Sequence, residues 1–352
     1  MIKPTLCILN FNGADILPIA LRAACAIEDR FAGIIVVDNA SEDRSIELIE
    51  SEFPEVRVLR QDSNLGAAGG RNAGLEQLSC ELILFIDNDV ALTADCVDKL
   101  VTALEQRPDA SIAVPAVIYA NQHDVVQYAG AQCHFLGLQI LDNENISIAA
   151  MNPMVKEMGS LVSCCFLIDK SRLPDRELFD ESFFIYFEDH EFGVRVRALG
   201  SHLLAVPSAQ CLHGKGTDGL SIRRLGSYSS RRVFYLIRNR WLFLLKTYSL
   251  RTLLVLLPML IVYEVAQFLT ILKKGWIKEW ARSVAWVFRH LPPLLAERRR
   301  IQSLRQVADR ELITGGALPF RSELTTSRVE RFARALLDRV ANGYWQLASR
   351  LI

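Results

Sequence analysis

The chain has 352 residues, of which 40 are basic and 40 acidic, so its formal charge is zero and the sequence as a whole does not indicate a nucleic-acid-binding protein. Its length is sufficient for one large hydrophobic core or two smaller domains. Hydrophobic residues make up 51% of the chain and the mean hydropathy is +0.19, which is high for a soluble enzyme, and the excess is local.

The cysteines are expected to be reduced, and the N-terminal residues lead us to expect a chain that stays on the cytoplasmic side. The eight cysteines stand in apolar contexts without a CxxC pair, which predicts reduced core thiols, Cys164 and Cys165 among them, rather than a disulfide framework. Residues 1–13 contain neither a long apolar segment nor a small-residue cleavage site. We therefore expect no signal peptide.

Between residue 4 and about residue 120, apolar strand-like segments alternate with amphipathic helical segments. We predict strands at 5–12, 33–39, 56–61 and 81–89, and helices at 14–28, 41–53, 67–79 and 94–106. Ser41 is expected to cap the second of these helices. This alternation is typical of an α/β fold with a Rossmann-like, mostly parallel sheet flanked by helices.

Polar side chains collect where the predicted strands end. Three strands are followed by amides or carboxylates: Asn10, Asn12, Asp38, Asn39, Asp87 and Asp89. Ligands of open α/β sheets bind at the carboxyl ends of the strands, so these positions are candidate binding residues. Taken alone, Asp38 fits a turn or capping residue as well as an acceptor for the base or ribose of a nucleotide.

The segment LFIDNDV, residues 84–90, places two carboxylates one residue apart at the end of an apolar strand. Asp87 and Asp89 could flank a solvated turn. They could also hold a hard divalent cation, with water and phosphate completing its coordination. The position of the pair after a buried strand, downstream of the other polar strand ends, favours the second interpretation.

The glycine-rich segment NLGAAGGRNAG, residues 64–74, precedes a predicted helix. Glycines such as Gly66 let a backbone approach a ligand closely, and a helix N-terminus favours anions. The alternative is a loop that needs left-handed backbone and tight helix packing. The segment follows Asp38 instead of preceding it, so the order does not fit a nicotinamide or flavin site, and no GK[ST] follows that would indicate a nucleoside triphosphatase.

The acidic and aromatic segment FFIYFEDHEF, residues 183–192, admits two interpretations. It could begin an ordinary amphipathic helix, with its aromatic residues in the core and its acids in solvent. It could instead present Glu188 or Asp189 for proton transfer. We assign His190 to the surface.

The C-terminal third has a different composition. Between 219 and 251 there are eight basic residues and no acidic one, and an apolar stretch of 20 residues follows at 253–272. That length can cross a bilayer, but the stretch contains Pro258, Glu264 and Gln267, so a monotopic attachment and a single span both stay open, as does a buried hairpin. Tryptophans alternate with basic residues in 276–291, as in an interfacial helix. We predict amphipathic helices in residues 297–352, for which self-association is an open alternative.

Six motifs occur in an order that resembles the family 2 glycosyltransferases of the GT-A fold, in particular the rhamnosyltransferase-like branch of bacterial cell-surface glycan synthesis. The motifs are LNFN, VVDNASED, NLGAAGGRNAG, LFIDNDV, LFDESFFIYFEDHEFGVRVRALG and VPSAQCLHGKGTDGLS. The resemblance runs from about residue 4 to 240. It implies a nucleotide-sugar-binding half at 1–120, an acceptor-binding and catalytic half at 121–240, and a helical membrane-associated region at 241–352.

The resemblance also implies roles for individual residues. The donor nucleotide would be bound by Asn10, Asn12, Asp38, Asn39, Gly66, Arg71, Asn72 and Asp87. A Mn²⁺ or Mg²⁺ ion would be held by Asp87, Asp89 and His213. Asp189 would be the catalytic base, with Glu188 as its neighbour.

The implied function is the inverting transfer of one sugar from a nucleotide-sugar, dTDP-rhamnose or a UDP-sugar, to a lipid-linked or growing surface glycan at the cytoplasmic face of the inner membrane. Arg240 and Trp241 occur where processive synthases carry Q-x-x-R-W, but Ile237 replaces the glutamine and only one long apolar stretch exists, which favours single transfer. The glycine pair that usually precedes FDE is missing, so the acceptor loop is expected to differ.

Two rival functions remain at the level of the sequence. A sugar-nucleotide nucleotidyltransferase would show a glycine-rich, lysine-bearing loop after its first strand, and NFNGADILP, residues 10–18, lacks one. A catalytically inactive, membrane-anchored glycan-assembly protein would not need Asp87, Asp89 and Asp189, all of which are present.

Overall fold

The computed structural model describes residues 2–174, 177–214, 216, 229–319 and 327–352. By packing, these fall into two compact units. The first comprises 1–131, 142–196 and 201–227, and the second comprises 132–141, 197–200 and 228–352. The division at 120 and 240 expected from the sequence stays a prediction. The motif VPSAQCLHGKGTDGLS and the basic stretch after it lie partly outside the described residues.

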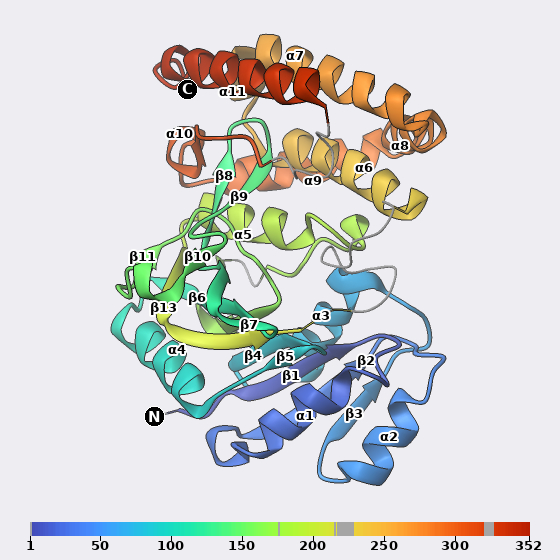
Figure 1. Cartoon of the computed structure of the whole chain (residues 1–352), viewed down its shortest axis with the longest axis vertical. Helices are drawn as coiled ribbons and strands as arrows, with labels where there is room; N and C mark the ends of the chain where they lie inside the picture. Colours follow the sequence, from blue (N-terminus) through green and yellow to red (C-terminus); the bar gives the residue numbers. More distant parts are fainter. Residues whose placement is uncertain (1, 175–176, 215, 217–228, 320–326) are drawn as a thin grey trace. The chain divides into compact units, whose positions relative to one another are not determined.

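Residues 5–106 of the first unit have the predicted alternation of strands and helices (Figure 1). The alternating strands are β1 (Thr5–Asn10), β2 (Gly33–Asp38), β3 (Arg57–Arg60) and β4 (Leu82–Asp87), and the helices are α1 (Leu17–Cys25), α2 (Ser45–Glu52), α3 (Gly66–Gln77) and α4 (Ala94–Gln106). The four strands pair in parallel in the order β4-β1-β2-β3. Their apolar side chains are almost wholly buried, as near-continuous apolar strands require.

The rest of the sheet is mixed. Strand β12 (Cys165–Asp169) lies antiparallel between β4 and β6 (Ala110–Tyr119). Strand β13 (His202–His213) runs parallel to β6, and its last residues pair with the short strand β5 (Val90–Ala91). Strands β7 (Gln122–Tyr128), β10 (Ile146–Ser147) and β11 (Lys156–Glu157) are antiparallel additions. Parallel order is therefore confined to β4-β1-β2-β3 and to the β6–β13 pair.

The expected cap at Ser41 is wrong. Helix α2 begins at Ser45, and Arg44 at its N-cap position makes no side-chain capping bond. The Ser41 hydroxyl instead donates to the Asp38 carboxylate, at 2.6 Å, and accepts from the backbone N–H of Asn12, at 2.9 Å. Ser41 thus orders the loop between β2 and α2 and not the helix end.

The second unit is built from helices and a small sheet. Its helices are α6 (Ser230–Thr247), α7 (Leu250–Lys274), α8 (Ile277–Arg289), α9 (Leu291–Leu304), α10 (Asp309–Leu312) and α11 (Arg328–Ala348). Its sheet has the order β14-β8-β9, formed by Ile313–Thr314, Ala131–His134 and Leu138–Leu141. Helix α6 packs against α8 and α9, and the Phe135 ring stacks on Trp345 of α11 at 5.0 Å.

Helix α7 contains the apolar stretch predicted from the sequence. It is the one described helix whose length and hydropathy suit a membrane span, and 28% of its most apolar window is buried. Its midpoint is tied to α6, because Glu264 pairs with the buried Arg240 and accepts from the Trp241 indole at 3.2 Å. Length and composition alone do not separate a spanning helix from one that packs on its own domain.

Candidate active site

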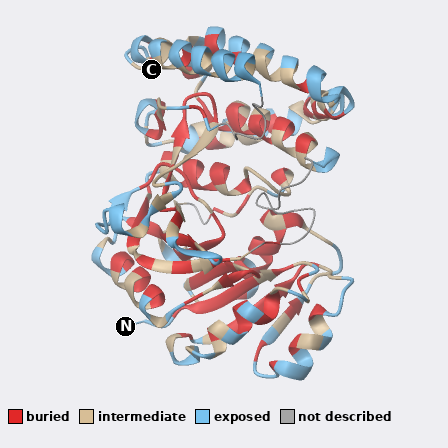
Figure 2. Cartoon of the chain, viewed as in Figure 1, coloured by how far each residue is buried: buried red, intermediate tan, exposed pale blue. Residues whose placement is uncertain are grey.

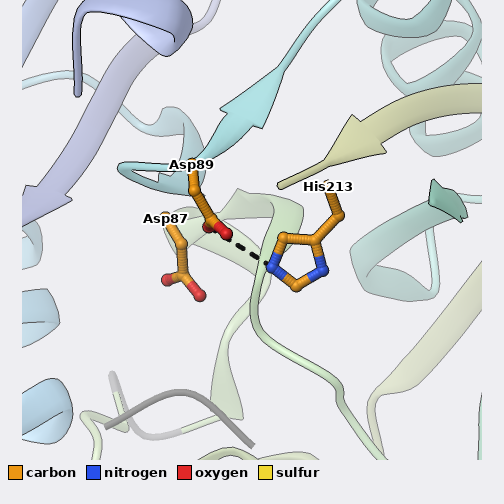
Figure 3. A group of neighbouring side chains, drawn as sticks. All are labelled: Asp87, Asp89 and His213. Atoms are coloured by element: carbon orange, nitrogen blue, oxygen red, sulfur yellow. Dashed lines mark ion pairs between the residues drawn. The ribbon is translucent and has the colours of Figure 1, made fainter. Parts of the chain in front are cut away.

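Two carboxylates and a histidine come together at one edge of the sheet (Figure 3). Asp87 ends β4, Asp89 lies in the turn between β4 and β5, and His213 ends β13. Antiparallel pairing places His213 opposite Val90, and the backbone N–H of Gly214 donates to the Asp89 carbonyl at 2.8 Å. The ends of β4 and β13, which are 126 residues apart in the chain, thereby face one another.

The side chains of this cluster can share one ion. Each residue offers a ligand atom, and these atoms lie within 4.8 Å of one another. Asp89 and His213 are buried, Asp87 is half-buried, and the His213 Nε2 atom lies 3.4 Å from Asp89 Oδ1. Carboxylate oxygens suit Mg²⁺ and Mn²⁺, and an imidazole nitrogen suits Mn²⁺ and other transition metals.

Gln127 on β7 determines which nitrogen of His213 faces the carboxylates. The Gln127 Oε1 atom lies 2.8 Å from His213 Nδ1, and because an amide oxygen only accepts, Nδ1 carries the proton. The Nε2 lone pair is then turned toward Asp89 Oδ1, another acceptor. Two acceptors in that position need a cation or a proton between them, so the geometry fits a divalent metal ion.

Gln127→Ala is expected to lower the affinity for Mn²⁺ about 10- to 100-fold, because the His213 ring would lose the partner that fixes its tautomer and orientation. Calorimetric titration with Mn²⁺ measures this. Gln122→Ala, an exposed position on the same strand, is the matched control and should bind Mn²⁺ like the unaltered protein. Equal affinities for the two variants would show that Gln127 does not orient a metal ligand.

Arg71 connects the carboxylate cluster with the acidic start of α5 (Glu188–Ala198). Its buried guanidinium donates to Asp87 Oδ1 at 3.0 Å, to Glu188 Oε1 at 3.2 Å and to the Ser163 carbonyl at 3.1 Å. Helix α3 is rich in glycine and alanine near Arg71, which lets it lie close against β1 and β2. The structure thus brings Arg71, Asp87 and Glu188 together, and the donor-binding and catalytic roles assigned to them from the sequence stay predictions.

Glu188 and Asp189 occupy different environments. Burial and the neighbouring Asp189 charge raise the pKa of Glu188 to about 8, against the opposing effect of Arg71. Burial also raises the pKa of Asp189, while Arg71 and hydrogen bonds from His190 and Ser163 lower it. The Asp189 carboxylate accepts from the Ser163 N–H and hydroxyl, both at 3.2 Å, and from the His190 N–H at 2.7 Å. Glu188 therefore holds a proton at neutral pH more readily than Asp189, leaving Asp189 as the better proton acceptor.

The segment that leads into α5 has unusual backbone conformations. Phe184, Tyr186 and Phe187 all have φ between 64° and 69°, a region that non-glycine residues rarely adopt. The Phe184 carbonyl accepts from the Ala68 N–H, at 3.2 Å, in the first turn of α3. Backbone strain of this kind is found at active sites, where surrounding structure imposes it.

Gly66→Ala is expected to destabilise the fold by at least about 2 kcal/mol, because φ at Gly66 is +73° and an added Cβ would lie 2.2 Å from the Phe184 carbonyl oxygen. Urea unfolding followed by circular dichroism measures the change. Gly33→Ala is the matched control, since no atom lies within 4 Å of its added Cβ, and its midpoint should stay unchanged or rise slightly. Equal midpoints for the two variants would contradict the assigned contact.

The residues predicted to bind the nucleotide form one hydrogen-bonded group at the ends of β1 and β2. Asn10 donates to Asp38 Oδ1 at 2.9 Å and accepts from Asn88 at 2.9 Å. The Asn12 side chain accepts from the Glu42 N–H at 2.8 Å, and its φ is +50°. Asp38 is 2% exposed. These bonds link Asn10 and Asp38, which are predicted to bind the base, to Asn88, the middle residue of the Asp-Asn-Asp turn.

Asn39 and Asn72 are engaged with the chain itself. Asn39 donates to the Gly66 carbonyl at 2.8 Å and accepts from the Leu65 N–H at 2.9 Å, so it orders the start of α3. Asn72 bonds to the Phe179 backbone through both ends of its amide, at 2.9 Å each, and to Glu181. Both are placed to shape the site, and direct donor contact by either stays a prediction.

His190 is buried, not exposed as expected, because the first turn of α5 directs it inward to Ser160, with 2.6 Å between His190 Nδ1 and the Ser160 hydroxyl. Sequence reasoning also missed Gln127 and Ser163, which hold His213 and Asp189. Neither lies in a recognisable motif. Their contacts span 86 and 26 residues of chain, so the sequence contains no local signal for them.

The described cysteines agree with the prediction of reduced thiols. All eight are free, and Cys7, Cys96, Cys133, Cys164, Cys165 and Cys211 are buried. Burial raises the pKa of Cys7 and of Cys133 to about 12. Such thiols are structural and not nucleophilic.

Comparison with known proteins was consistent with this geometry. Residues 5–170 match the model of glycosyl transferase family 2. An N-acetylglucosaminyl-diphospho-decaprenol L-rhamnosyltransferase of Mycobacterium tuberculosis is 24% identical over 208 residues, covering 53% of this chain and 68% of the relative. A low-salt glycan biosynthesis hexosyltransferase of Haloferax volcanii is 24% identical over 217 residues, covering 60% of this chain and 66% of the relative.

Among solved structures, GalNAc-T7 with UDP, GalNAc and Mn²⁺ superimposes with a TM-score of 0.55 at 16% identity, over 69% of this chain and 48% of that one. At this identity the likeness concerns the fold, which is the GT-A fold. The matched region contains the strand ends that present Asp38, Asp87 and Asp89. The chain therefore carries a family 2 glycosyltransferase domain with the GT-A fold, and we identify it as a glycosyltransferase.

Proposed function

We propose that the protein is an inverting, divalent-metal-dependent glycosyltransferase that moves a single sugar from a nucleotide-sugar, dTDP-rhamnose or a UDP-sugar, to a lipid-linked or growing cell-surface glycan. The observation that carries this proposal is the network that joins Asp89 and His213, through Asp87 and Arg71, to Glu188 and Asp189. One end of the network suits a metal–diphosphate group and the other suits an acceptor hydroxyl.

The metal end would bind Mn²⁺ or Mg²⁺ through Asp87, Asp89 and His213. A divalent ion there would neutralise charge on the diphosphate leaving group as the glycosidic bond breaks. Arg71 is held between Asp87 and Glu188, so it positions Asp87. Because its guanidinium already compensates part of the Asp87 charge, Asp89 is the stronger candidate for the direct metal ligand.

The acidic end supplies the base. The Asp189 carboxylate is oriented by three donated hydrogen bonds and would accept the proton of the acceptor hydroxyl as that oxygen attacks the anomeric carbon. Direct attack inverts the anomeric configuration and requires no protein nucleophile. Burial raises the pKa of both carboxyl groups, but the hydrogen bonds from Ser163 and His190 lower that of Asp189, which leaves Asp189 as the ionised member of the pair.

The donor base would be recognised at Asp38. Its Oδ1 atom accepts from Asn10 and Ser41, and its Oδ2 atom accepts from the Ser41 N–H. A carboxylate oxygen can accept a further hydrogen bond, so Oδ2 retains capacity for a donor such as the imide N–H of uracil or thymine. Asn10 and Asn12 would complete this pocket.

A lipid-linked acceptor would place the protein at the cytoplasmic face of the inner membrane. The name of the mycobacterial relative describes an acceptor of this kind, a sugar diphosphate on a polyprenol. The apolar helix α7 supports attachment to a membrane. The sugar, the linkage and the polyprenol belong to that relative, and the chemical class of acceptor is what we propose for this chain.

A panel of nucleotide-sugars incubated with the purified protein and Mn²⁺, Mg²⁺ or EDTA tests the proposal. We expect binding and slow hydrolysis of one dTDP- or UDP-sugar, abolished by EDTA and restored by excess Mn²⁺. Product analysis by NMR should show inversion when an acceptor is supplied. Absence of both binding and hydrolysis across the panel, or full activity in EDTA, would refute the metal-dependent function.

A further inference from the structure

Helices α7 and α11 of the second unit lie side by side and antiparallel (Figure 1). Near one end of the pair Lys273 forms an ion pair with Glu330, and near the other the Tyr344 hydroxyl donates to the Val255 carbonyl. Residue 264 of α7 lies midway between the two contacts, and so does residue 337 of α11. Because both helices rise by about 1.5 Å per residue, these two positions are roughly level with each other.

Large apolar side chains are exposed at the same levels on both helices. Ile261, Val265 and Leu269 of α7 are level with Val340, Leu336 and Phe332 of α11. Their exposed fractions lie between 46% and 71%. We call these six residues the apolar strip, and the exposed surface of both helices extends well beyond it (Figure 2).

The exposed ionisable side chains of α7, α8 and α11 all have one sign. On α7, α8 and α11, every residue of which the structure describes, each exposed ionisable side chain is basic, including Arg328, Arg331 and Arg339 of α11. The acidic residues of these helices are not exposed: Glu264 and Glu330 are in ion pairs, Glu279 is buried, and Asp338 accepts from the Leu318 N–H at 2.9 Å. An apolar face bordered by cations suits an anionic lipid surface.

We propose that the apolar strip rests on an anionic lipid bilayer, with α7 and α11 lying in the plane of its interface. This deepens the proposed function, because it assigns a lipid partner to a transferase whose acceptor we take to be lipid-linked. Residues 328–348, for which the sequence analysis left self-association open, would then form half of the membrane-binding surface.

Two alternatives, a membrane-spanning α7 and a second copy of the chain packed on the apolar strip, fit the observations less well. If α7 crossed the bilayer, the ion pair between Glu264 and the buried Arg240 would have to lie at the middle of the hydrocarbon layer, where charged groups are costly. If a second copy covered the strip about a two-fold axis, the exposed basic residues of α7 and α11 in the two copies would face each other, and like charges repel.

Vesicle flotation with the full chain tests the proposal. Phosphatidylcholine vesicles are compared with vesicles containing 30% phosphatidylglycerol, at low salt and at 0.5 M NaCl. We expect binding to the anionic vesicles that weakens with salt and at least a tenfold lower partition coefficient for F332S/L336S. The matched control I19S/M154S replaces two equally exposed apolar residues of the first unit and should bind like the unaltered chain.

A second variant, R331S/R339S, keeps the apolar strip and should lose the preference for anionic vesicles. Binding of F332S/L336S equal to that of the control would overturn the proposal. Resistance of the bound chain to extraction at pH 11 would overturn it in favour of a spanning helix. Vesicle binding that is absent, together with concentration-dependent dimers that F332S/L336S abolishes, would overturn it in favour of a second copy.

Hydrolysis of the nucleotide-sugar in vesicle-free solution separates this inference from the proposed function. F332S/L336S should hydrolyse the donor at the unaltered rate, because its substitutions lie outside the site. Normal hydrolysis by F332S/L336S together with unchanged vesicle binding would refute only the proposal that the apolar strip binds the bilayer. If the unaltered chain hydrolysed no donor but bound vesicles in a way that F332S/L336S weakens, only the proposed function would be refuted.

Discussion

Asp89→Ala is expected to abolish metal-dependent donor binding and to lower the transfer rate by at least about 1,000-fold, equivalent to about 4 kcal/mol of transition-state stabilisation. The reason is the position of Asp89, which is buried and lies 3.4 Å from the His213 nitrogen that faces it. No other described carboxylate shares that cluster except Asp87, which is already paired with Arg71. The variant therefore keeps only a weakened ligand set.

Thermal unfolding with increasing Mn²⁺ separates loss of metal from loss of fold. A ligand that binds only the folded state raises the unfolding temperature, so the unaltered protein should be stabilised by Mn²⁺ and Asp89→Ala should not. In the absence of metal the variant should be at least as stable, because it loses one of two neighbouring negative charges. Asp95→Ala, which removes an exposed carboxylate paired with Lys99, is the control and should respond to Mn²⁺ normally. If Mn²⁺ stabilised the unaltered protein and both variants equally, Asp89 would not be a metal ligand.

Asp189→Asn is expected to lower the rate of transfer by about 100- to 10,000-fold while the donor dissociation constant changes less than twofold. Asparagine keeps the shape of the side chain but cannot take the proton of the acceptor hydroxyl. The substitution also replaces one acceptor oxygen by an amide NH₂ group, which is a donor. That group would face the N–H of either His190 or Ser163, so a modest loss of stability accompanies the change.

Single-turnover kinetics with a saturating donor, together with calorimetric donor titration, distinguishes the base from a binding residue. Ser163→Ala is the matched control, because it removes one hydrogen bond to Asp189 and leaves the carboxylate in place. That bond lowers the pKa of Asp189, so its loss should move the acidic limb of the pH–rate profile upward with little change at the plateau. Turnover of Asp189→Asn within tenfold of the unaltered protein would assign the base elsewhere.

The acidic limb itself has a predicted direction. A base must be ionised, so activity should fall as the pH decreases through the pKa of Asp189, and burial raises that pKa above the ordinary value for an aspartate. Glu188, with a pKa raised to about 8, loses its proton on the alkaline side and would add a second negative charge beside Asp189. The two groups titrate as a coupled pair, so the profile reports the pair.

Most of the fold of residues 4–120 could be predicted from the sequence because its signals are local. An apolar strand of four to six residues, a turn and an amphipathic helix each leave a pattern within a few positions, and repetition of that pattern predicts a parallel sheet. The carboxyl ends of parallel strands meet at one edge, so Asn10, Asp38 and Asp87 could be assigned to one site without a structure. The family motifs placed Asp189 and His213 in the same region.

The local signals also misled at two positions. Ser41 has the right residue type for a helix cap, but the buried Asp38 carboxylate, only three residues away, is a stronger acceptor for its hydroxyl. His190 stands among acids and was assigned to solvent, whereas the turn of α5 directs it into the core. In each case a tertiary environment outweighed a residue-type preference.

By itself the sequence determined the α/β architecture of the first half, the glycosyltransferase motifs and the residues that end the strands. Only the tertiary structure decided that Gln127 orients His213, that Arg71 joins Asp87 to Glu188, and that α11 lies beside α7 with exposed apolar residues at matching levels. The physical reason is separation along the chain. Strand and helix periodicity is encoded over a few residues, but these contacts join residues that are 86, 117 and 89 positions apart, and only the packed fold brings them within bonding distance.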